Sequence, residues 1–416
     1  MTGLVRLALG NCAVLLLHED HANPSIAFRG SVRAGGAYGA AGAGEFAARL
    51  LMRGTRRRTA AKVSDAIENV GAALSVANGV ESASIDGRCT RETLRTVLAI
   101  LAECLSEPSF PAAEVEKVRG EILGDIRAQQ DDTRRAAMRR LVELVYPAGH
   151  PYRRDPKGDE RTVAKLTRAD ARAFHGAHYG AAGLAVAFSG DLDERTFRST
   201  VAAAFEGLDA GTPPVPVAAP RAAKVGRALL PMPHKSQADF AAGRLAPARG
   251  DPGYYAVNLA NVLFGRIGLY GRLGAQVRDN LGLAYYSFSG LESRHAAGHW
   301  YVSAGVNPAN LAKSMAAIRA EMERLEREPF TDREIADGKE HLVGSLHVNL
   351  ERNAEYASAL HDIEYYGLGA DFLDRYPGIV HGLDPDAVRR TAVETFDPDA
   401  CSWVASGPLK GAKLAF

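Results

Sequence analysis

Hydrophobic and polar positions alternate along the chain with two different periods, which predict groups of strands and helices in turn. The segment TAAKVSDAIENVGAA places Val63, Ile67 and Val70 on one helical face and ends at Gly71, a natural helix stop. The next segments, ALSVANG and ESASIDGRC, alternate like strands. Residues 111–146 are highly charged and predict a helical stretch, and GLAVAFSGD then predicts a buried strand that closes the first half.

The second half repeats this order of elements, which indicates a duplication. It contains the segments YYAVNLANVLFG, AYYSFSGLES and HWYVSAGV, a long predicted helix through residues 331–365, and a last strand, CSWVASG. Matching residues keep a constant spacing inside an element and drift between elements, as loop insertions produce. The matches are Gly54 and Gly71 with Gly265 and Gly282 (211 positions), Phe110, Glu114 and Gly124 with Phe330, Glu334 and Gly344 (220 positions), and Ser189-Gly190 with Ser406-Gly407 (217 positions).

A Pro-rich segment separates the two halves. Residues 211–221, which begin GTPPVPVAAP, carry four prolines without helical or strand periodicity and predict an interdomain linker. We therefore expect an N-terminal domain over residues 1–210 and a C-terminal domain over residues 222–416. The order of elements predicts an α+β fold of two duplicated domains of about 200 residues, each a mostly antiparallel sheet with helices packed on one face.

Composition places the chain among ordinary globular proteins and indicates no nucleic-acid partner. Hydrophobic residues make up 46% and charged residues 24%, and the formal net charge is +1. The one basic cluster, which includes Arg53, Arg58 and Lys62 around a Gly54-Thr55 turn, is interpreted as a solvated loop. The four cysteines lie far apart without a C-x-x-C pair, so we interpret them as reduced core residues.

The apolar N-terminus is interpreted as folded structure rather than as a targeting segment. In VRLALGNCAVLLLHED, the pair Gly10-Asn11 interrupts the apolar run, which predicts two short strands around a turn. The longest apolar run there, residues 12–17, is far below the roughly 20 residues that span a bilayer. We expect no membrane interaction and a cytoplasmic location for the sequence as it stands, or a periplasmic one if a leader has been removed.

The most specific pattern of the first half is the segment GEFAARLLMRGTRRRTAAKVSDAIENVGAALSV. It resembles the sequence around the inverted zinc motif, H-x-x-E-H, of the pitrilysin/insulinase-type zinc peptidases, in particular the small-subunit branch that includes the mitochondrial processing peptidase. The resemblance covers nearly the whole chain. The motif itself is altered, because both metal-binding histidines and the general-base glutamate are absent. Its five positions are occupied by Glu45, Phe46, Ala47, Ala48 and Arg49.

The resemblance also assigns the third zinc ligand, a glutamate that ends a stretch similar to E-R-G-V-I-L-x-E. That position is Asp125 here, and the first glutamate of the stretch is replaced by Val118. A catalytic zinc takes three protein ligands, so we expect no metal in this chain. Arg49 either places a cation at the metal position, facing Asp125, or forms an i, i+4 ion pair with Glu45 worth about 0.3–0.5 kcal/mol. We favour the ion pair.

Two further groups are candidate sites. The stretch VRDNLGLAY resembles the family's V-R-E-x-x-G-L-A-Y, which implies a substrate-binding pair, Arg278 and Tyr285. Arginine offers a fixed fork of donors, and a tyrosine hydroxyl can bond a developing oxyanion, although both side chains could instead simply pack. His175 and His178 form an H-x-x-H on a predicted helix, but no third metal ligand is apparent nearby, so we favour a structural role.

The resemblance implies a division of labour between two chains that face each other around a chamber. The partner, a paralogous subunit with H-x-x-E-H, carries the zinc and cleaves a peptide substrate, while this chain, inactive alone, supplies Arg278 and Tyr285 as its non-catalytic, substrate-binding subunit. The alternative is a proteolytically inactive scaffold or peptide-binding protein, since core proteins of a respiratory complex resemble the same fold. A self-sufficient enzyme is disfavoured because no Ser-His-Asp or Cys-His set is readable.

Overall fold

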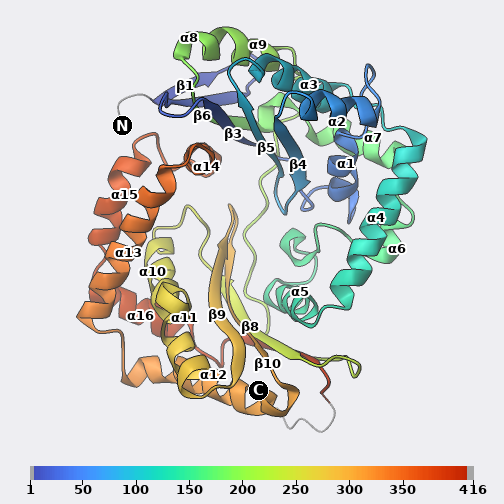
Figure 1. Cartoon of the computed structure of the whole chain (residues 1–416). Coiled ribbons are helices and arrows are strands. Elements are labelled where there is room, and N and C mark those ends of the chain that lie inside the picture. Colours follow the sequence, from blue (N-terminus) through green and yellow to red (C-terminus); the bar gives the residue numbers. More distant parts are fainter. Residues whose placement is uncertain (1–3, 410–416) are drawn as a thin grey trace. The chain divides into compact units, whose positions relative to one another are not determined.

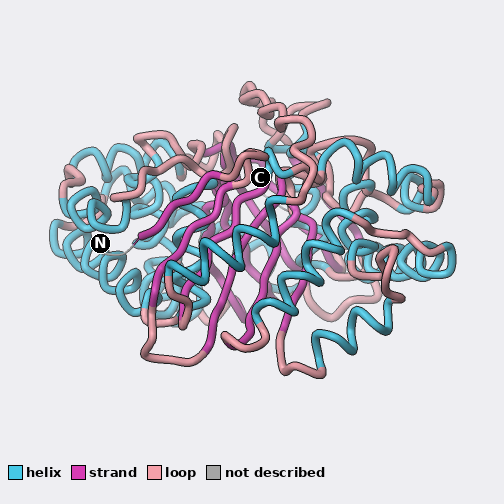
Figure 2. Tube along the Cα trace, turned by 90° about the horizontal axis from the view of Figure 1, so that it is seen from above, coloured by secondary structure: helices cyan, strands magenta, loops and turns pink. Residues whose placement is uncertain are grey.

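The computed structural model describes residues 4–409, apart from the side chains of residues 269, 270, 278 and 279, and divides into two compact units (Figure 1). Unit 1 comprises Met1–Ile126, Arg154–Pro216 and His347–Leu373. Unit 2 comprises Arg127–Arg153, Val217–Leu346 and Asp374–Phe416. Each unit contains one largely antiparallel sheet with packed helices, so the predicted α+β class is confirmed (Figure 2, strands magenta and helices cyan).

Unit 1 contains a six-stranded sheet in the order β1-β2-β6-β3-β5-β4, in which only β2 and β6 pair in parallel. The N-terminal strands β1 and β2 pair around the Gly-Asn turn, as predicted. The strands are β1 (Leu4–Ala8), β2 (Val14–Glu19), β3 (Ser25–Val32), β4 (Ala73–Asn78), β5 (Ala83–Thr90) and β6 (Leu184–Gly190). The helices are α1 (Ala43–Leu51), α2 (Ala60–Glu68), α3 (Leu94–Ser106), α4 (Ala112–Gln130), α6 (Glu160–Val163), α7 (Arg168–His178), α8 (Glu194–Thr196), α9 (Ala202–Glu206) and α14 (Asn353–Tyr365).

Unit 2 contains a five-stranded sheet in the order β7-β11-β8-β10-β9, in which β7 and β11 are parallel. Strand β9 therefore lies at one edge of this sheet. The strands are β7 (Arg227–Pro231), β8 (Ala238–Ala246), β9 (Ala284–Ser293), β10 (Gly298–Val306) and β11 (Ser402–Gly407). The helices are α5 (Thr133–Val145), α10 (Tyr254–Gly265), α11 (Ile267–Leu273), α12 (Leu311–Arg327), α13 (Asp332–Leu350), α15 (Phe372–His381) and α16 (Pro385–Thr395), with a π-helical turn, η4 (Gly274–Asn280).

The two long predicted helices are each interrupted, which corrects the sequence interpretation. Residues 111–146 form α4 and α5 with a break at residues 131–132, and residues 331–365 form α13 and α14 with a break at residues 351–352. The first break has a clear local cause, because the Asp132 side chain accepts a hydrogen bond from the backbone N–H of Arg135 and caps α5. Residues 209–226, which include the Pro-rich segment, contain neither helix nor strand.

The helices that follow these breaks pack on the sheet of the other half of the sequence. Helix α5 contacts β8 and β11 in unit 2, and α14 contacts β3 and β6 in unit 1. Their first residues, Thr133 and Asn353, stand 220 positions apart, which is the spacing of the duplication in this region. The compact units are therefore not contiguous in sequence, unlike the predicted domains over 1–210 and 222–416.

The duplicated serines attach these helices to the sheets. The Ser189 hydroxyl on β6 donates a hydrogen bond to Asn353 Oδ1 at 3.1 Å, and the Ser406 hydroxyl on β11 donates to the Thr133 carbonyl at 2.5 Å. Each serine thus fixes the first residue of a helix that arrives from the other half. Both serines are completely buried, so these bonds also satisfy hydroxyl groups that water cannot reach.

The two faces of the unit 1 sheet are covered differently. Phe28 and Phe188 belong to the main hydrophobic core on one face. Ser31, which points to the opposite face because strand residues alternate, bonds the His361 ring on α14 at 2.8 Å. Helix α14 therefore covers part of the second face of this sheet. Within residues 4–409, no helix is long and apolar enough to cross a membrane.

Candidate functional site

The three positions assigned to zinc ligands come together in unit 1, on α1 and α4. Arg49 Nε lies 2.6 Å from Glu45 Oε1, and Arg49 Nη2 lies 2.5 Å from Asp125 Oδ2. The i, i+4 ion pair is confirmed, and Arg49 also faces Asp125. The two interpretations of Arg49 are therefore both realised, since its planar guanidinium bridges two carboxylates.

A second bridge lies one turn away on α4, and its arginine belongs to the segment that follows α1. Arg53, four residues after Arg49, places Nη2 at 2.9 Å from Glu121, which is four residues before Asp125. The arginines advance along the chain while their carboxylate partners go back along α4, so α1 and α4 run antiparallel here. Arg53 also approaches Glu114 at 3.6 Å, so each of the two arginines lies between two carboxylates.

Burial strengthens the charge pairing around Arg49. The side chain of Glu45 is only 8% exposed, that of Arg49 is 26% exposed and that of Asp125 is 44% exposed. Burial alone would lower the pKa of Arg49, but the hydrogen bond that it donates to Asp125 and the attraction of Glu45 outweigh burial and raise that pKa. Arg49 is thus a permanent cation at the centre of the cluster.

This donor set does not fit zinc. Zinc needs lone-pair donors such as imidazole or carboxylate, whereas a guanidinium has five N–H donors and no acceptor. The general-base position is Ala48, a buried methyl group that cannot take a proton from water. Within the part of the chain that the structure describes, no group of three or more His, Cys, Asp and Glu side chains could hold a metal ion.

The basic cluster is only partly solvated, which corrects its interpretation as a solvated loop. Arg56 and Arg57 are exposed. Arg53 is paired as described above, and Arg58 Nε lies 3.0 Å from Glu103 on α3. Arg57 also pairs with Glu107, at 3.4 Å, although its side chain is 68% exposed, so three of these four arginines attach the loop to carboxylates around it.

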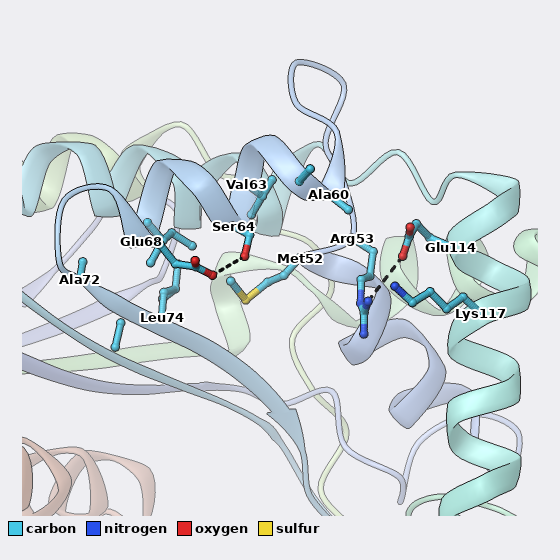
Figure 3. A pocket seen from close by; sticks show the side chains of 13 residues that line it. Met52, Arg53, Ala60, Val63, Ser64, Glu68, Ala72, Leu74, Glu114 and Lys117 are labelled. Atoms are coloured by element: carbon cyan, nitrogen blue, oxygen red, sulfur yellow. Dashed lines mark hydrogen bonds and ion pairs between the residues drawn. The ribbon is translucent and has the colours of Figure 1, made fainter.

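A cavity of about 650 Å³ lies beside this loop, between α2, the start of β4 and α4 (Figure 3). Its apolar lining includes Val63, Ile67 and Leu74. Arg53 and Glu114 form an ion pair in its wall, and Figure 3 shows this pair facing the cavity from the side of α4. The cavity has room for an apolar side chain next to a charged group, but it contains no histidine or cysteine among its lining residues.

His175 and His178 are used in packing. His175 Nε2 lies 2.8 Å from the Leu105 carbonyl oxygen, and its ring stacks on Tyr179. The His178 ring packs against Phe174, with ring centroids 4.5 Å apart. Burial lowers the pKa of both histidines and therefore favours their neutral forms.

The second candidate group belongs to unit 2. Tyr285 is the second residue of edge strand β9. It is 66% exposed, which is high for a tyrosine within a strand. Gly282, with φ of 61°, makes the tight turn between η4 and β9 in the left-handed region that favours glycine. Arg278 belongs to η4, but its side chain lies outside the described part of the structure.

Two family models match successive parts of the chain. "Insulinase (Peptidase family M16)" matches residues 20–150, and "Peptidase M16 inactive domain" matches residues 165–342. The chain belongs to peptidase family M16. The resemblance to pitrilysin/insulinase-type peptidases is thereby confirmed.

Similar M16 proteins include both peptidases and a respiratory-complex subunit by name. A Streptomyces coelicolor protein named an uncharacterized zinc protease is 27% identical over 375 residues, covering 89% of this chain and 81% of its own length. Subunit 1 of the Bos taurus cytochrome b-c1 complex is 26% identical over 167 residues, covering 40% of this chain and 35% of its own length. The structure of a peptidase M16 inactive domain from Pseudomonas fluorescens superposes with a TM-score of 0.91 at 23% identity, covering 97% of this chain and 98% of that one.

Within this M16 chain, the structure adds residues that the motifs do not include. The second bridge, from Arg53 just after α1 to Glu121 on α4, adjoins the altered zinc site. Its sequence signal was available, since both residues stand four positions from the predicted ligand positions. A hydrogen bond between Tyr286 and the buried Asp239 adjoins Tyr285, and no local pattern signals it because the partners are 47 residues apart.

Proposed function

We propose that this chain is the non-catalytic, substrate-binding subunit of a heterodimeric zinc metallopeptidase. Its partner is a paralogous M16 chain that contains H-x-x-E-H and binds the zinc ion. One observation carries the proposal: the Arg49 guanidinium stands between the other two altered ligand positions in unit 1, while Tyr285 in unit 2 is 66% exposed on an edge strand. A chain of this kind can contact a substrate but has no group that activates water by the M16 mechanism.

The roles follow from the chemistry of the two side chains. The Tyr285 hydroxyl donates a hydrogen bond to the oxyanion that forms when water attacks the peptide carbonyl in the partner's site. The Arg278 guanidinium, seven residues earlier, anchors a substrate carbonyl or carboxylate through its fork of donors. Arg278 therefore acts on substrate binding, whereas Tyr285 acts on the transition state.

A proteolytically inactive scaffold or peptide-binding protein is the second candidate function. It is supported by the similarity to subunit 1 of the bovine cytochrome b-c1 complex. The exposed Tyr285 favours the peptidase subunit, because a scaffold has no need for a tyrosine hydroxyl in solvent at the end of the arginine–tyrosine motif.

Two substitutions test the proposed function in a complex reconstituted from this chain and its H-x-x-E-H partner. Tyr285→Phe removes one hydroxyl and should lower kcat about 10- to 1000-fold, the range for loss of one transition-state donor. Arg278→Ala should also raise KM, because a charged anchor contributes to ground-state binding.

Tyr301→Phe is the matched control. Tyr301 lies on the neighbouring strand β10 and is half-buried, and its phenol packs across Gly290 of β9. Association of the subunits and thermal unfolding are measured for all three variants. Wild-type kcat/KM in both Tyr285→Phe and Arg278→Ala, or losses that follow melting or dissociation, would support the scaffold instead.

A further inference from the structure

We propose that Asp239 and Tyr286 are positioning residues that hold a β-bulge in place and thereby set the direction of the Tyr285 side chain. The catalytic consequence rests on the proposed function of Tyr285, whereas the bulge and its attachment belong to unit 2 itself. Neither residue belongs to the altered zinc site, to the His175–His178 pair or to the arginine–tyrosine pair that the sequence motifs indicate.

The bulge is visible in the pairing of β9 with β10. Gly305 pairs with Tyr286, but the next residue, Val306, pairs with Ala284, and the register shifts between them. Tyr285 is therefore the additional residue, with no partner opposite it. A bulge disrupts the regular alternation of side chains and redirects the residue at its centre, which explains how Tyr285 becomes exposed at the start of a paired strand.

A hydrogen bond across the sheet fixes this bulge. The Tyr286 hydroxyl donates to Asp239 Oδ1 on β8, two strands away, and therefore passes over β10. The residue beneath it is Gly305, where a Cβ atom would lie 2.3 Å from Tyr286 Cε1 and 2.9 Å from Asp239 Oδ1. Only glycine leaves the space through which the tyrosine reaches the carboxylate.

Asp239 is a stable anchor because its buried carboxylate accepts hydrogen bonds from three side chains. It is completely inaccessible to solvent, and such a group is tolerated only when hydrogen bonds replace its lost hydration. Besides Tyr286, it accepts bonds from the Thr133 hydroxyl at 2.5 Å and from Gln237 Nε2 at 3.0 Å. The first residue of α5, the inner strand β8 and the edge strand β9 thus meet at one carboxylate.

The Tyr286 hydroxyl remains a donor in this environment. Its burial and then the negative charge of Asp239 raise the pKa of Tyr286 well above its usual value, so the hydroxyl keeps its proton. The Arg134 guanidinium lies over the ring, with its carbon 4.8 Å from the ring centroid, and adds a cation–π contact. Tyr286 is therefore held at both its ring and its hydroxyl.

Without this attachment the start of β9 has little to define its register. An edge strand pairs on one side only, and a shift of one residue moves every side chain to the other face. Such a shift would reverse the directions of the Tyr285 and Tyr286 side chains relative to the sheet. Asp239 and Tyr286 therefore determine which of two adjacent tyrosines is presented to a substrate.

A double-mutant cycle in the reconstituted complex tests this role. Tyr286→Phe should lower kcat/KM about 10- to 100-fold, as expected when a catalytic group is misplaced by about 1 Å. In the Tyr285→Phe background it should cause no further loss, because the displaced hydroxyl is already gone. The control Tyr301→Phe, which removes a hydroxyl from the same sheet face, should leave kcat/KM unchanged. Equal losses from Tyr286→Phe in both backgrounds would overturn the proposal.

Amide hydrogen exchange of the isolated chain gives a readout that does not depend on activity. Tyr286→Phe should speed exchange across residues 284–287 about tenfold or more, and Tyr301→Phe should not. If Tyr285→Phe leaves kcat/KM at the wild-type value, the proposed function fails, and the exchange experiment alone then decides whether Asp239 and Tyr286 hold the bulge. Identical exchange in Tyr286→Phe and wild type would refute the positioning role in either case.

Discussion

Replacing Arg49 with methionine tests whether a side-chain cation holds the altered zinc site together. Methionine keeps an unbranched chain of similar length, so packing along the stem is largely retained and the charge is lost. The substitution leaves Glu45 and Asp125 next to each other without the guanidinium that bridges them.

The cost is set mainly by Glu45. Its side chain is 8% exposed, so losing a hydrogen bond to a charged partner costs about 1.5–3 kcal/mol. Asp125 is 44% exposed and also lies 3.9 Å from Lys157 Nζ, so water and this lysine compensate it, and its share is about 0–1 kcal/mol. Together the two contributions predict a loss of about 1.5–4 kcal/mol in the free energy of unfolding.

Urea unfolding at pH 7 measures this loss, with two further variants as controls. Arg57→Met removes an arginine that is 68% exposed and whose ion pair with Glu107 is 3.4 Å long, and should cost less than about 0.5 kcal/mol. Adding Glu45→Gln to Arg49→Met removes the unpaired charge and should restore at least about half of the loss. The reasoning is refuted if Arg49→Met costs no more than Arg57→Met, or if Glu45→Gln restores nothing.

Two other predictions concern metal content and pH. Elemental analysis of the purified chain after dialysis against a chelator should find no stoichiometric zinc; one zinc per chain that disappears on substitution of His175 or His178 would establish a different metal site. Burial of His299 lowers its pKa to about 4, so between about pH 6.5 and pH 4 the unfolded chain binds a proton that the folded chain does not. The free energy of unfolding should therefore fall as the pH drops through this window, by up to about 3 kcal/mol, and it should fall less in His299→Asn; equal pH profiles for the two proteins would show that His299 is not responsible.

Much of the fold is local enough to be predicted from sequence. The N-terminal strand pair, the helix that ends before Gly71 and the strands β4, β5, β6, β9, β10 and β11 follow from hydrophobic periodicity and glycine turns, whereas β3, β7 and β8 were not predicted. The Ser189 and Ser406 pairs, noticed only as a repeat, prove to bind equivalent helices. The altered ligand positions also converge as the family pattern implies, because α1 and α4 preserve the spacing of their turns.

The packing of α5 and α14, each on the sheet of the other half of the sequence, could not be predicted in the same way. An apolar helical face shows that a helix packs on something, but it does not specify which of two similar sheets receives it. The signals that were present, Asp132 as an N-cap and equal spacing of Thr133 and Asn353, show where the helices begin and not where they pack. The Asp239 anchor was missed for a related reason, since its donors come from residues far apart in the chain.

The most direct test of the proposed function is peptide hydrolysis by this chain alone, by a paralogous H-x-x-E-H chain alone, and by mixtures of the two. We predict no turnover by this chain, and turnover by its partner that rises as this chain is added and saturates at a one-to-one ratio. Hydrolysis by this chain without a partner, or a mixture no faster than the partner alone, would contradict a substrate-binding subunit that completes the zinc site of another chain.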